Sequence, residues 1–164
     1  MDSAEKFRET VRSNFKFKLF MLKELPSAFF SGIKITEITE EKAVVRIPFK
    51  FLTKNPFKSM YFASQAMAAE LATGILALSQ ISGRKPAVSM LVFDMNAHFS
   101  KKARTAVHFT CNNGAEIKAA VEETIRTGEG VTVEAKSVGI DKSGDIVSEF
   151  TFIWTFKVKQ KRQS

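Results

Sequence analysis

Apolar side chains recur along the first third of the chain with two different periods. In residues 4–24 they stand three or four positions apart with charges between them, which predicts an amphipathic helix that stops near Pro26. Residues 33–49 instead alternate apolar and polar side chains, with two consecutive acids near the middle. A period of two is typical of a strand, so this segment predicts a β-hairpin with its turn at Glu40 and Glu41.

The next segment, residues 59–80, is apolar on nearly all sides. An Asn-Pro step breaks the chain before it, Ser59 offers an N-cap, and Gly83 and Pro86 close it. A helix without a polar face is buried all round. In a chain of 164 residues, one sheet must wrap such a helix.

The second half of the chain supplies that sheet. β-branched and aromatic residues predict four strands, in residues 87–95, 104–112, 130–139 and 146–159. Helical spacing returns in residues 115–127 and predicts a second, partly exposed helix that ends at Gly128. The order of these elements predicts an α+β fold, with an antiparallel sheet curled around one central helix.

Length and composition predict one domain over residues 1–164, with an N-terminal helical part at 1–26 and a free tail at 160–164. Forty-five per cent of the residues are hydrophobic, which is enough for a packed core. The single Cys111 cannot form an internal disulfide, and the start lacks the basic-then-apolar order of a signal peptide. Glu70 and several polar side chains make the central helix a poor membrane span. We therefore expect a soluble cytoplasmic protein.

The formal net charge is +8, and the Lys and Arg residues gather in clusters. This charge favours anionic partners such as nucleic acid, an acidic membrane surface or a phosphorylated small molecule, although a solvated surface explains it equally well. No RNA-binding motif and no Gly-rich phosphate loop is visible. Cys111, His98 and His108 lack the spacing of metal ligands. We expect no metal, no nucleic acid and no membrane as partners.

Glu70 is the one acid of the central helix. A helix turns by about 100° per residue, so the face around Glu70 carries mostly small residues, which let another backbone come close. These are Ser59, Ala63, Ala66, Met67, Thr73, Gly74 and Ala77. Desolvation at such a seam raises the pKa of a carboxylate and makes it a better base near neutral pH. A structural role, as a partner of backbone amides or of an Arg, stays open.

Tyr61 and Glu70 lie on opposite sides of this helix. Nine residues make two and a half turns, which separates them by roughly 13 Å along the axis. They cannot meet on one helix, but two copies packed about a two-fold axis would bring them together. One site would then use Asn55 and Tyr61 from one chain and Glu70 from the other. We expect a homodimer for this reason, and the pairing of dimers into a tetramer stays open.

The element order, and Asn55 followed by Tyr61 and Glu70, resemble the hotdog-fold thioesterases, above all the phenylacetate-pathway type of acyl-CoA thioesterase. The stretch NPFKSMYFASQAMAAELATGI is also similar to a mostly bacterial branch of that superfamily, the domain of unknown function 4442. The resemblance covers about residues 30–158. It implies hydrolysis of an acyl thioester of coenzyme A or of acyl carrier protein, with no cofactor beyond the coenzyme A of the substrate.

The resemblance assigns roles position by position. Asn55 matches the family Asn that helps hold the attacking water or the thioester group. Glu70 matches the acid that acts as general base or nucleophile. Ser89 falls near a Ser or Thr that assists the water in some members. These roles are implied by the family and are expectations for this chain.

The start of the central helix departs from the family. Tyr61 replaces His, and Phe62 and Ala63 replace Gly-Gly, where backbone N–H groups at the positive end of the helix bind the thioester oxygen. Ala63 still offers an N–H group. The Tyr61 hydroxyl can donate a hydrogen bond to the same oxygen, but it cannot act as an acid or base at neutral pH as His can.

Three functions remain open. The first is a thioesterase with its sites at a dimer interface. The second is a non-catalytic acyl-CoA or fatty-acyl binding protein of the same fold, which the loss of His-Gly-Gly favours. The third, a nucleic-acid binder, rests on charge alone. For the first two, the candidates to bind a phosphorylated pantetheine carrier are Lys101, Lys102 and Arg104.

Overall fold

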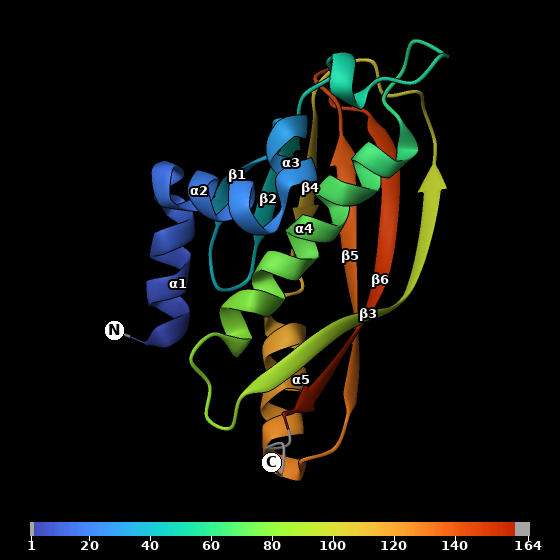
Figure 1. The fold of residues 1–164 in the computed structure, drawn as a ribbon. Helices are drawn as coiled ribbons and strands as arrows, with labels where there is room; N and C mark the ends of the chain where they lie inside the picture. Colours follow the sequence, from blue (N-terminus) through green and yellow to red (C-terminus); the bar gives the residue numbers. More distant parts are fainter. Residues whose placement is uncertain (1, 160–164) are drawn as a thin grey trace.

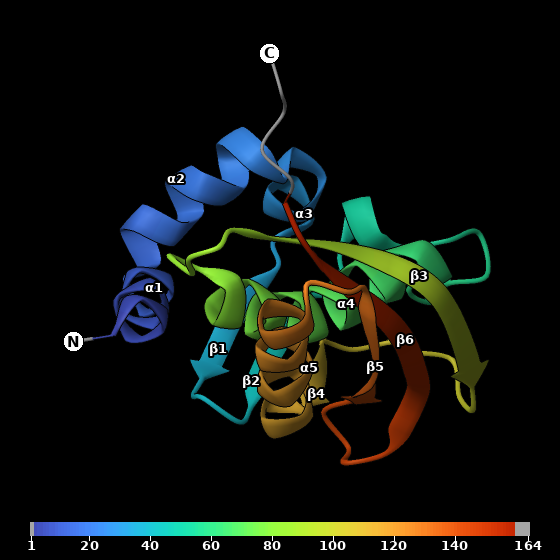
Figure 2. The same cartoon turned by 90° about the horizontal axis from the view of Figure 1, so that it is seen from below.

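The computed structural model of the protein describes residues 2–159, so the predicted tail at 160–164 lies outside the described residues. Six antiparallel strands form one sheet in the order β1-β2-β4-β5-β6-β3 (Figure 1). The strands are β1 (Lys34–Ile38), β2 (Ala43–Ile47), β3 (Val88–Phe99), β4 (Val107–Cys111), β5 (Val131–Ile140) and β6 (Ile146–Val158). The helices are α1 (Ser3–Arg12), α2 (Asn14–Glu24), α3 (Pro26–Ser31), the 3-10 turn η1 (Phe51–Thr53), α4 (Phe62–Ile81) and α5 (Gly114–Thr127). The sheet curves around α4 (Figure 2), which confirms the predicted α+β fold.

The central helix α4 forms the core of the protein. Every residue from Leu71 to Ala77 is buried, and Ala68, Ile75 and Leu76 have no exposed surface at all. α4 is long and apolar enough to cross a bilayer, yet 67% of its most apolar stretch is buried inside the protein. It is therefore a buried core helix and not a membrane span.

The prediction of one continuous helix over residues 4–24 is wrong, because α1 and α2 are separated at Ser13. Ser13 has an extended backbone, with φ −74° and ψ 96°. The buried residues give the reason: Val11 of α1 is followed by Phe17 and Met21 of α2. Six positions on one helix turn through about 240°, so a continuous helix would point Phe17 away from the face of Val11.

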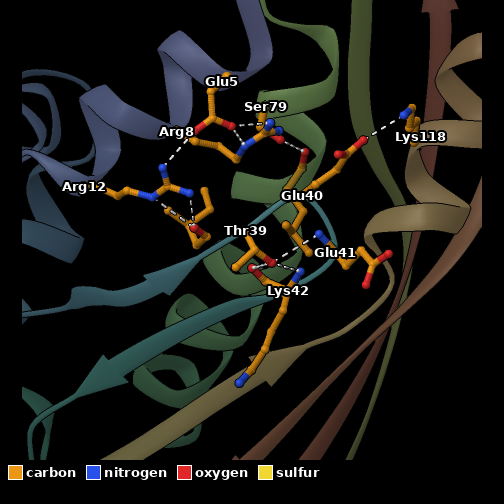
Figure 3. A network of polar contacts seen from close by, with 11 residues as sticks. Glu5, Arg8, Arg12, Thr39, Glu40, Glu41, Lys42, Ser79 and Lys118 are labelled. Carbon is orange, nitrogen blue, oxygen red and sulfur yellow. Dashed lines mark hydrogen bonds and ion pairs between the residues drawn. The ribbon is translucent and has the colours of Figure 1, made fainter. Parts of the chain in front are cut away.

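Polar contacts tie α1 to β1 and the β1–β2 turn to α5 (Figure 3). Glu5 accepts from Arg8 at 2.7 Å and from Arg12 at 2.8 Å, and Arg12 also donates to the last carbonyl of β1 at 3.0 Å. Lys118 of α5 lies 2.7 Å from Glu40 in the turn. These hydrogen bonds lower the pKa of Glu5 and of Glu40. Elements far apart in the sequence are fastened to one another in this way.

The edge strand β3 extends to Phe99, beyond its predicted end at residue 95. A bulge lies just before Asp94, whose side chain accepts a hydrogen bond from the backbone N–H of Met95 at 2.8 Å. Three large apolar side chains of this edge are exposed: Leu91 by 64%, Phe93 by 72% and Met95 by 46%. An unpaired edge with such side chains is typical of an association surface.

The start of α4 differs from its prediction. Tyr61 is the N-cap residue and no side chain caps the helix, so the prediction of Ser59 as N-cap is wrong. The Ser59 hydroxyl is engaged elsewhere, because it donates to Asn55 Oδ1 at 3.2 Å. The backbone N–H of Met60 donates to the carbonyl of Ala103 at 2.7 Å. This bond brings the segment that follows β3 beside the first turn of α4.

Candidate active site

A cleft of about 820 Å³ opens at the N-terminal end of α4. Most of its walls are apolar or aromatic and come from Pro56, Phe57, Met60, Tyr61, Phe62, Phe99 and Ala103. Its other lining residues are Lys54, Asn55, Ser59, Gln65, Ser100, Lys101 and Lys102. An apolar hollow with a few polar groups is the usual form of a ligand site. The structure thus brings together five of the site residues predicted from the sequence: Asn55, Tyr61, Phe62, Lys101 and Lys102.

Asn55 holds the loop that forms one wall of the cleft. Its Oδ1 accepts hydrogen bonds from the backbone N–H of Phe57 at 3.0 Å, from that of Ser59 at 3.3 Å and from the Ser59 hydroxyl. Its Nδ2 donates to the carbonyl of Met60 at 3.4 Å. The loop also contains Lys58 in a left-handed conformation, with φ 56°. Three donors already fill Oδ1, so Nδ2 is the atom of Asn55 that can serve a ligand.

The first turn of α4 has two backbone N–H groups, those of Phe62 and Ala63, for which none of the described residues is an acceptor. The next two N–H groups, of Ser64 and Gln65, both donate to the carbonyl of Tyr61, at 3.0 and 3.2 Å. Free N–H groups at a helix N-terminus carry partial positive charge. They can stabilise negative charge that develops on a bound oxygen.

Two aromatic rings stand at the same place. Tyr61 is 47% exposed and Phe62 is 54% exposed, and their ring centroids lie 4.9 Å apart in an edge-to-face arrangement. Phe62 also meets Phe99 edge-to-face at 6.4 Å. The start of α4 is therefore walled by rings that extend from Tyr61 to the end of β3.

The three predicted basic residues are not equivalent. The Lys101 ammonium lies 2.9 Å from the Asp141 carboxylate and also pairs with Asp145. The hydrogen bond to Asp145 is the largest cause of a raised pKa of Lys101, and the bond to Asp141 is the next largest. Lys102 is exposed and forms no ion pair with any carboxylate in residues 2–159. Arg104 lies outside the cleft, in a smaller hollow of about 380 Å³. Of these three residues, Lys102 is therefore the one that lines the cleft and is best able to bind an anion.

Glu70 lies in the middle of α4 and is half-buried. Its carboxylate forms no hydrogen bond or ion pair with any residue in the described part of the chain, and burial raises its pKa. Gly74 leaves the space for it, because a Cβ there would lie 2.9 Å from Glu70 Oε1 and 3.3 Å from the Trp154 ring. Thr73 fixes that ring, since it accepts from Trp154 Nε1 at 2.9 Å. Glu70 is thus a desolvated carboxylate in a shaped recess.

Within one protomer, Glu70 does not line the cleft. It belongs to a stripe along α4 that stays half-buried while the residues between are buried, and the stripe consists of Ala63, Ala66, Met67 and Glu70. Ser89 does not line the cleft either, and its hydroxyl donates to the carbonyl of Lys157 at 3.0 Å. The structure therefore separates Glu70 and Ser89 from Asn55 and Tyr61 in the single chain.

The other titratable residues considered from the sequence, His108 and Cys111, give no sign of a catalytic or metal-binding role. Burial, followed by the charge of Arg46, lowers the pKa of His108, and burial raises the pKa of Cys111 to about 11. A thiol with so high a pKa is a poor nucleophile. Among residues 2–159, no three His, Cys, Asp or Glu side chains gather as metal ligands would.

The sequence prediction missed several cleft residues. Phe57, Phe99 and Ser100 line the cleft together, beside the bond from Met60 to the segment after β3, and no local pattern reveals that long-range pairing. Gln65 could have been found, since a long polar side chain in an otherwise apolar helix is a visible signal.

An antiparallel sheet curled around one long helix, with a cleft at the N-terminal end of that helix, defines the hotdog-fold class. Within this class the chain belongs to the family described as "Domain of unknown function (DUF4442)", which residues 14–156 match. No curated protein matches the chain. The resemblance seen in the sequence is therefore confirmed at the level of family and fold.

Solved structures agree with this assignment. A Pseudomonas aeruginosa protein of unknown function, described as a "Probable Thioesterase", has a TM-score of 0.75 and 18% identity over 88% of this chain and 96% of its own. A Haemophilus influenzae thioesterase has a TM-score of 0.65 and 14% identity over 89% and 92% of the two chains. A Staphylococcus aureus thioesterase has a TM-score of 0.62 and 14% identity over 79% and 97%. At such identities the likeness shows the fold alone.

Proposed function

We propose that this protein hydrolyses an acyl thioester of coenzyme A or of acyl carrier protein, with Glu70 as general base. The observation that carries the proposal is the state of Glu70: half-buried, without a partner among the described residues, and with a pKa raised by burial. A raised pKa brings a carboxylate nearer to working pH and makes its ionised form a stronger base. A carboxylate with a purely structural role would have hydrogen-bond partners.

The active site is completed by a second copy of the chain. The half-buried stripe around Glu70 consists of small side chains and Met67, and the exposed β3 edge carries Leu91, Phe93 and Met95. An antiparallel dimer through these surfaces would cover both and would place Glu70 of one protomer near the cleft of its partner. Dimerisation also excludes water from the seam, which strengthens the electrostatic interactions there.

In the proposed reaction, a water molecule attacks the carbonyl carbon of the thioester while the Glu70 carboxylate takes its proton. The carbonyl electrons move to the oxygen, and the free N–H groups of Phe62 and Ala63 stabilise that oxyanion. When the tetrahedral intermediate collapses, the C–S bond breaks and Glu70 returns the proton to the leaving thiolate. The products are a carboxylic acid and the free thiol.

The cleft suits a long carrier with a phosphorylated end. Lys54 and Lys102 are exposed at its lining, and an adjoining hollow of about 570 Å³ adds Phe51 and Lys58. The Lys54 ammonium lies 4.7 Å from the centroid of the exposed Phe51 ring. Lysines beside an aromatic ring can receive the phosphates and the adenine of coenzyme A.

Two residues of a structurally similar protein have the same spacing as Asn55 and Glu70. Two solved variants of the Staphylococcus aureus protein replace a glutamine and a glutamate by alanine, and the two positions are fifteen residues apart. Asn55 and Glu70 have the same separation. The relative carries an amide side chain and a carboxylate at matching spacing.

A second candidate function is binding of an acyl thioester without cleavage. Two observations favour it: Asn55 Oδ1 is filled by three donors of its own loop, and the Phe62 ring stands at the helix start, where the phenylacetate-pathway thioesterases that the sequence resembles have Gly. A filled oxygen cannot orient the attacking water, and a ring can narrow the approach of the thioester carbonyl.

Release of free thiol from a panel of short, aromatic and long acyl-CoAs distinguishes the two functions. For the hydrolase we expect turnover by the wild type and a loss of roughly 10²–10⁴-fold in Glu70→Gln, the usual contribution of a general base. Glu116→Gln, which removes the same charge at an exposed position of α5, is the matched control and should keep full activity. If the wild type binds acyl-CoA tightly without turnover, the protein is an acyl-thioester binding protein and not a hydrolase. If Glu70→Gln does not change turnover, Glu70 is not the general base.

A further inference from the structure

Gln65 places a buried amide at the inner end of the cleft. It is the fourth residue of α4, in the first turn, and although it lines the cleft only 3% of it is exposed. Four large apolar side chains, Phe57, Met60, Phe62 and Phe99, line the cleft with it. A polar group in such surroundings needs hydrogen-bond partners, and an unused donor there favours a ligand that carries an acceptor.

The two ends of the Gln65 amide are bound differently. Oε1 accepts a hydrogen bond at 2.7 Å from the hydroxyl of Ser148, a residue of β6 without exposed surface. Nε2 reaches the carbonyl of Met60 at 3.5 Å, which is the far limit of a hydrogen bond. The opposite orientation of the amide would set two carbonyl oxygens against each other. Nε2 therefore stays on the side of Met60, a residue that lines the cleft.

Among residues 2–159, one donor of Gln65 has no partner. An amide nitrogen carries two protons, and the one long bond to Met60 uses at most one of them. We infer that Gln65 Nε2 recognises an oxygen acceptor on the acyl group of the ligand. The cleft then prefers acyl groups with a hydroxyl or keto oxygen over plain hydrocarbon ones. This inference rests on the proposed function, because it takes an acyl thioester as the ligand.

The position of Gln65 tells which part of the ligand it meets. The exposed Lys54 and Lys102 mark the open end of the cleft, where the phosphates of the carrier would stay. Gln65 is at the buried end, so the acyl part of the thioester reaches it. Phe62 and Ala63, whose N–H groups are free, precede Gln65 on the same turn of α4. The recognised oxygen therefore lies a few bonds beyond the thioester carbonyl, as in 3-hydroxyacyl and 3-oxoacyl groups.

Binding to the full-length Glu70→Gln protein tests this preference without turnover. Titration calorimetry would compare 3-hydroxybutyryl-CoA with butyryl-CoA, which differ in one hydroxyl group. We expect the hydroxylated ligand to bind roughly tenfold more tightly, the usual effect of one well-placed neutral hydrogen bond. The double variant Gln65→Met with Glu70→Gln keeps the length of the side chain but removes the donor. In it the two ligands should bind within about twofold of each other, through weaker binding of the hydroxylated one.

Each other outcome has a definite meaning. An unchanged preference in the double variant overturns the role of Gln65 while the proposed function stands. An equal loss of affinity for both ligands would mean that Gln65 binds the pantetheine instead of the acyl group, which overturns the inference as well. Failure of both CoA thioesters to bind Glu70→Gln, with no turnover by the wild type, overturns the proposed function and the inference together.

A control separates recognition from support of the fold. Ser148→Ala removes the bond that anchors Oε1 but leaves the Nε2 donor in place. We expect Ser148→Ala to lower thermal stability while the preference for the hydroxylated ligand is largely kept. If Gln65→Met lowers stability as much and leaves the preference intact, Gln65 has a structural role and the inference fails.

Discussion

The two parts of the proposed site, the cleft and the Glu70 recess, differ in how complete they are within one chain. A single protomer supplies the residues that line the cleft. The loop that forms one wall of the cleft is fixed by four hydrogen bonds of the Asn55 side chain. The Glu70 recess is shaped on its inner side by Gly74 and Trp154 but is half-open on its outer side. The cleft is therefore complete within one protomer, whereas the Glu70 recess needs a second surface to cover it.

This difference indicates a division of labour. A ligand can be bound by the groups of one protomer, because those groups already converge. The proposed base becomes effective only when another surface dries the seam, since its pKa and its proximity to a substrate depend on what covers it. Binding and catalysis should therefore respond separately to mutation and to dissociation of the dimer.

The largest expected effect concerns the pH dependence of the Glu70 recess. As general base, Glu70 must be ionised, so kcat/KM should fall about tenfold per pH unit below its pKa. Burial raises that pKa, so the fall should begin above the pH at which an ordinary Glu titrates. Binding of acyl-CoA in the cleft should stay constant over the same range. A kcat/KM profile that stays flat down to the ordinary pKa of Glu would contradict the assignment.

Gly74→Ala should disturb the recess without touching the cleft. The new Cβ would lie 2.9 Å from Glu70 Oε1 and 3.3 Å from Trp154, so the flexible carboxylate must move. We expect a loss of roughly tenfold in kcat with little change in KM, because displacing a catalytic group by a fraction of an ångström is costly. Gly130→Ala, where a Cβ meets nothing closer than 4.0 Å, is the control. Equal kcat for the two variants would mean that the position of Glu70 does not matter.

Stability should show the cost of the Glu70 carboxylate. Its pKa is raised in the folded state, so the folded protein holds the proton more tightly than the unfolded chain, and stability falls as pH rises through that pKa. The amide of the Glu70→Gln variant cannot ionise, so the variant does not lose this stability as pH rises. We expect Glu70→Gln to be more stable than the wild type at pH 8, by an amount in the ordinary range of roughly 0.5–3 kcal/mol, and the gap to close in acid. Urea unfolding at both pH values measures it, and a gap that widens in acid would contradict the sign.

The smallest expected effect compares two neighbouring lysines of the cleft. Lys102 has no carboxylate partner among the described residues, whereas Lys101 is held by Asp141 and Asp145. Lys102→Ala should raise KM for acyl-CoA by a few-fold, and the effect should fade at high salt because exposed charges are screened. Lys101→Ala should change KM less and instead lower stability slightly. The reverse order would show that Lys101 leaves its acidic partners to bind the phosphates.

Much of the fold could be predicted because its elements carry strong local patterns. The alternation of β6, the apolar run of α4 and the Gly128 terminus of α5 each fix an element by short-range chemistry. The break at Ser13 could not be predicted, since it depends on which side chains the distant core buries. The same is true of the N-cap of α4, because Asn55 competes for the Ser59 hydroxyl.

The site could be predicted in part. Asn55, Tyr61 and Phe62 are close in sequence, and their convergence follows from the loop that leads into α4. Lys101 and Lys102 were found by charge, but their difference depends on the acids of the β5–β6 turn, forty residues away. Spacing on a helix predicts that Glu70 lies apart from Tyr61, and in the structure Tyr61 lines the cleft while Glu70 does not.

Mixing two inactive variants tests most directly whether the site is shared between chains. Glu70→Gln removes the base, and Phe62→Pro removes one of the N–H donors at the first helical position, where Pro is tolerated and where Tyr61, with φ −64° and ψ 135°, suits a following Pro. Phe62→Ala, which keeps the N–H, is the control for the lost ring. A heterodimer of the two variants, purified through different tags, has one intact site out of two, so we expect about half of the wild-type thioesterase activity. A heterodimer as inactive as both parents would contradict a site divided between two protomers.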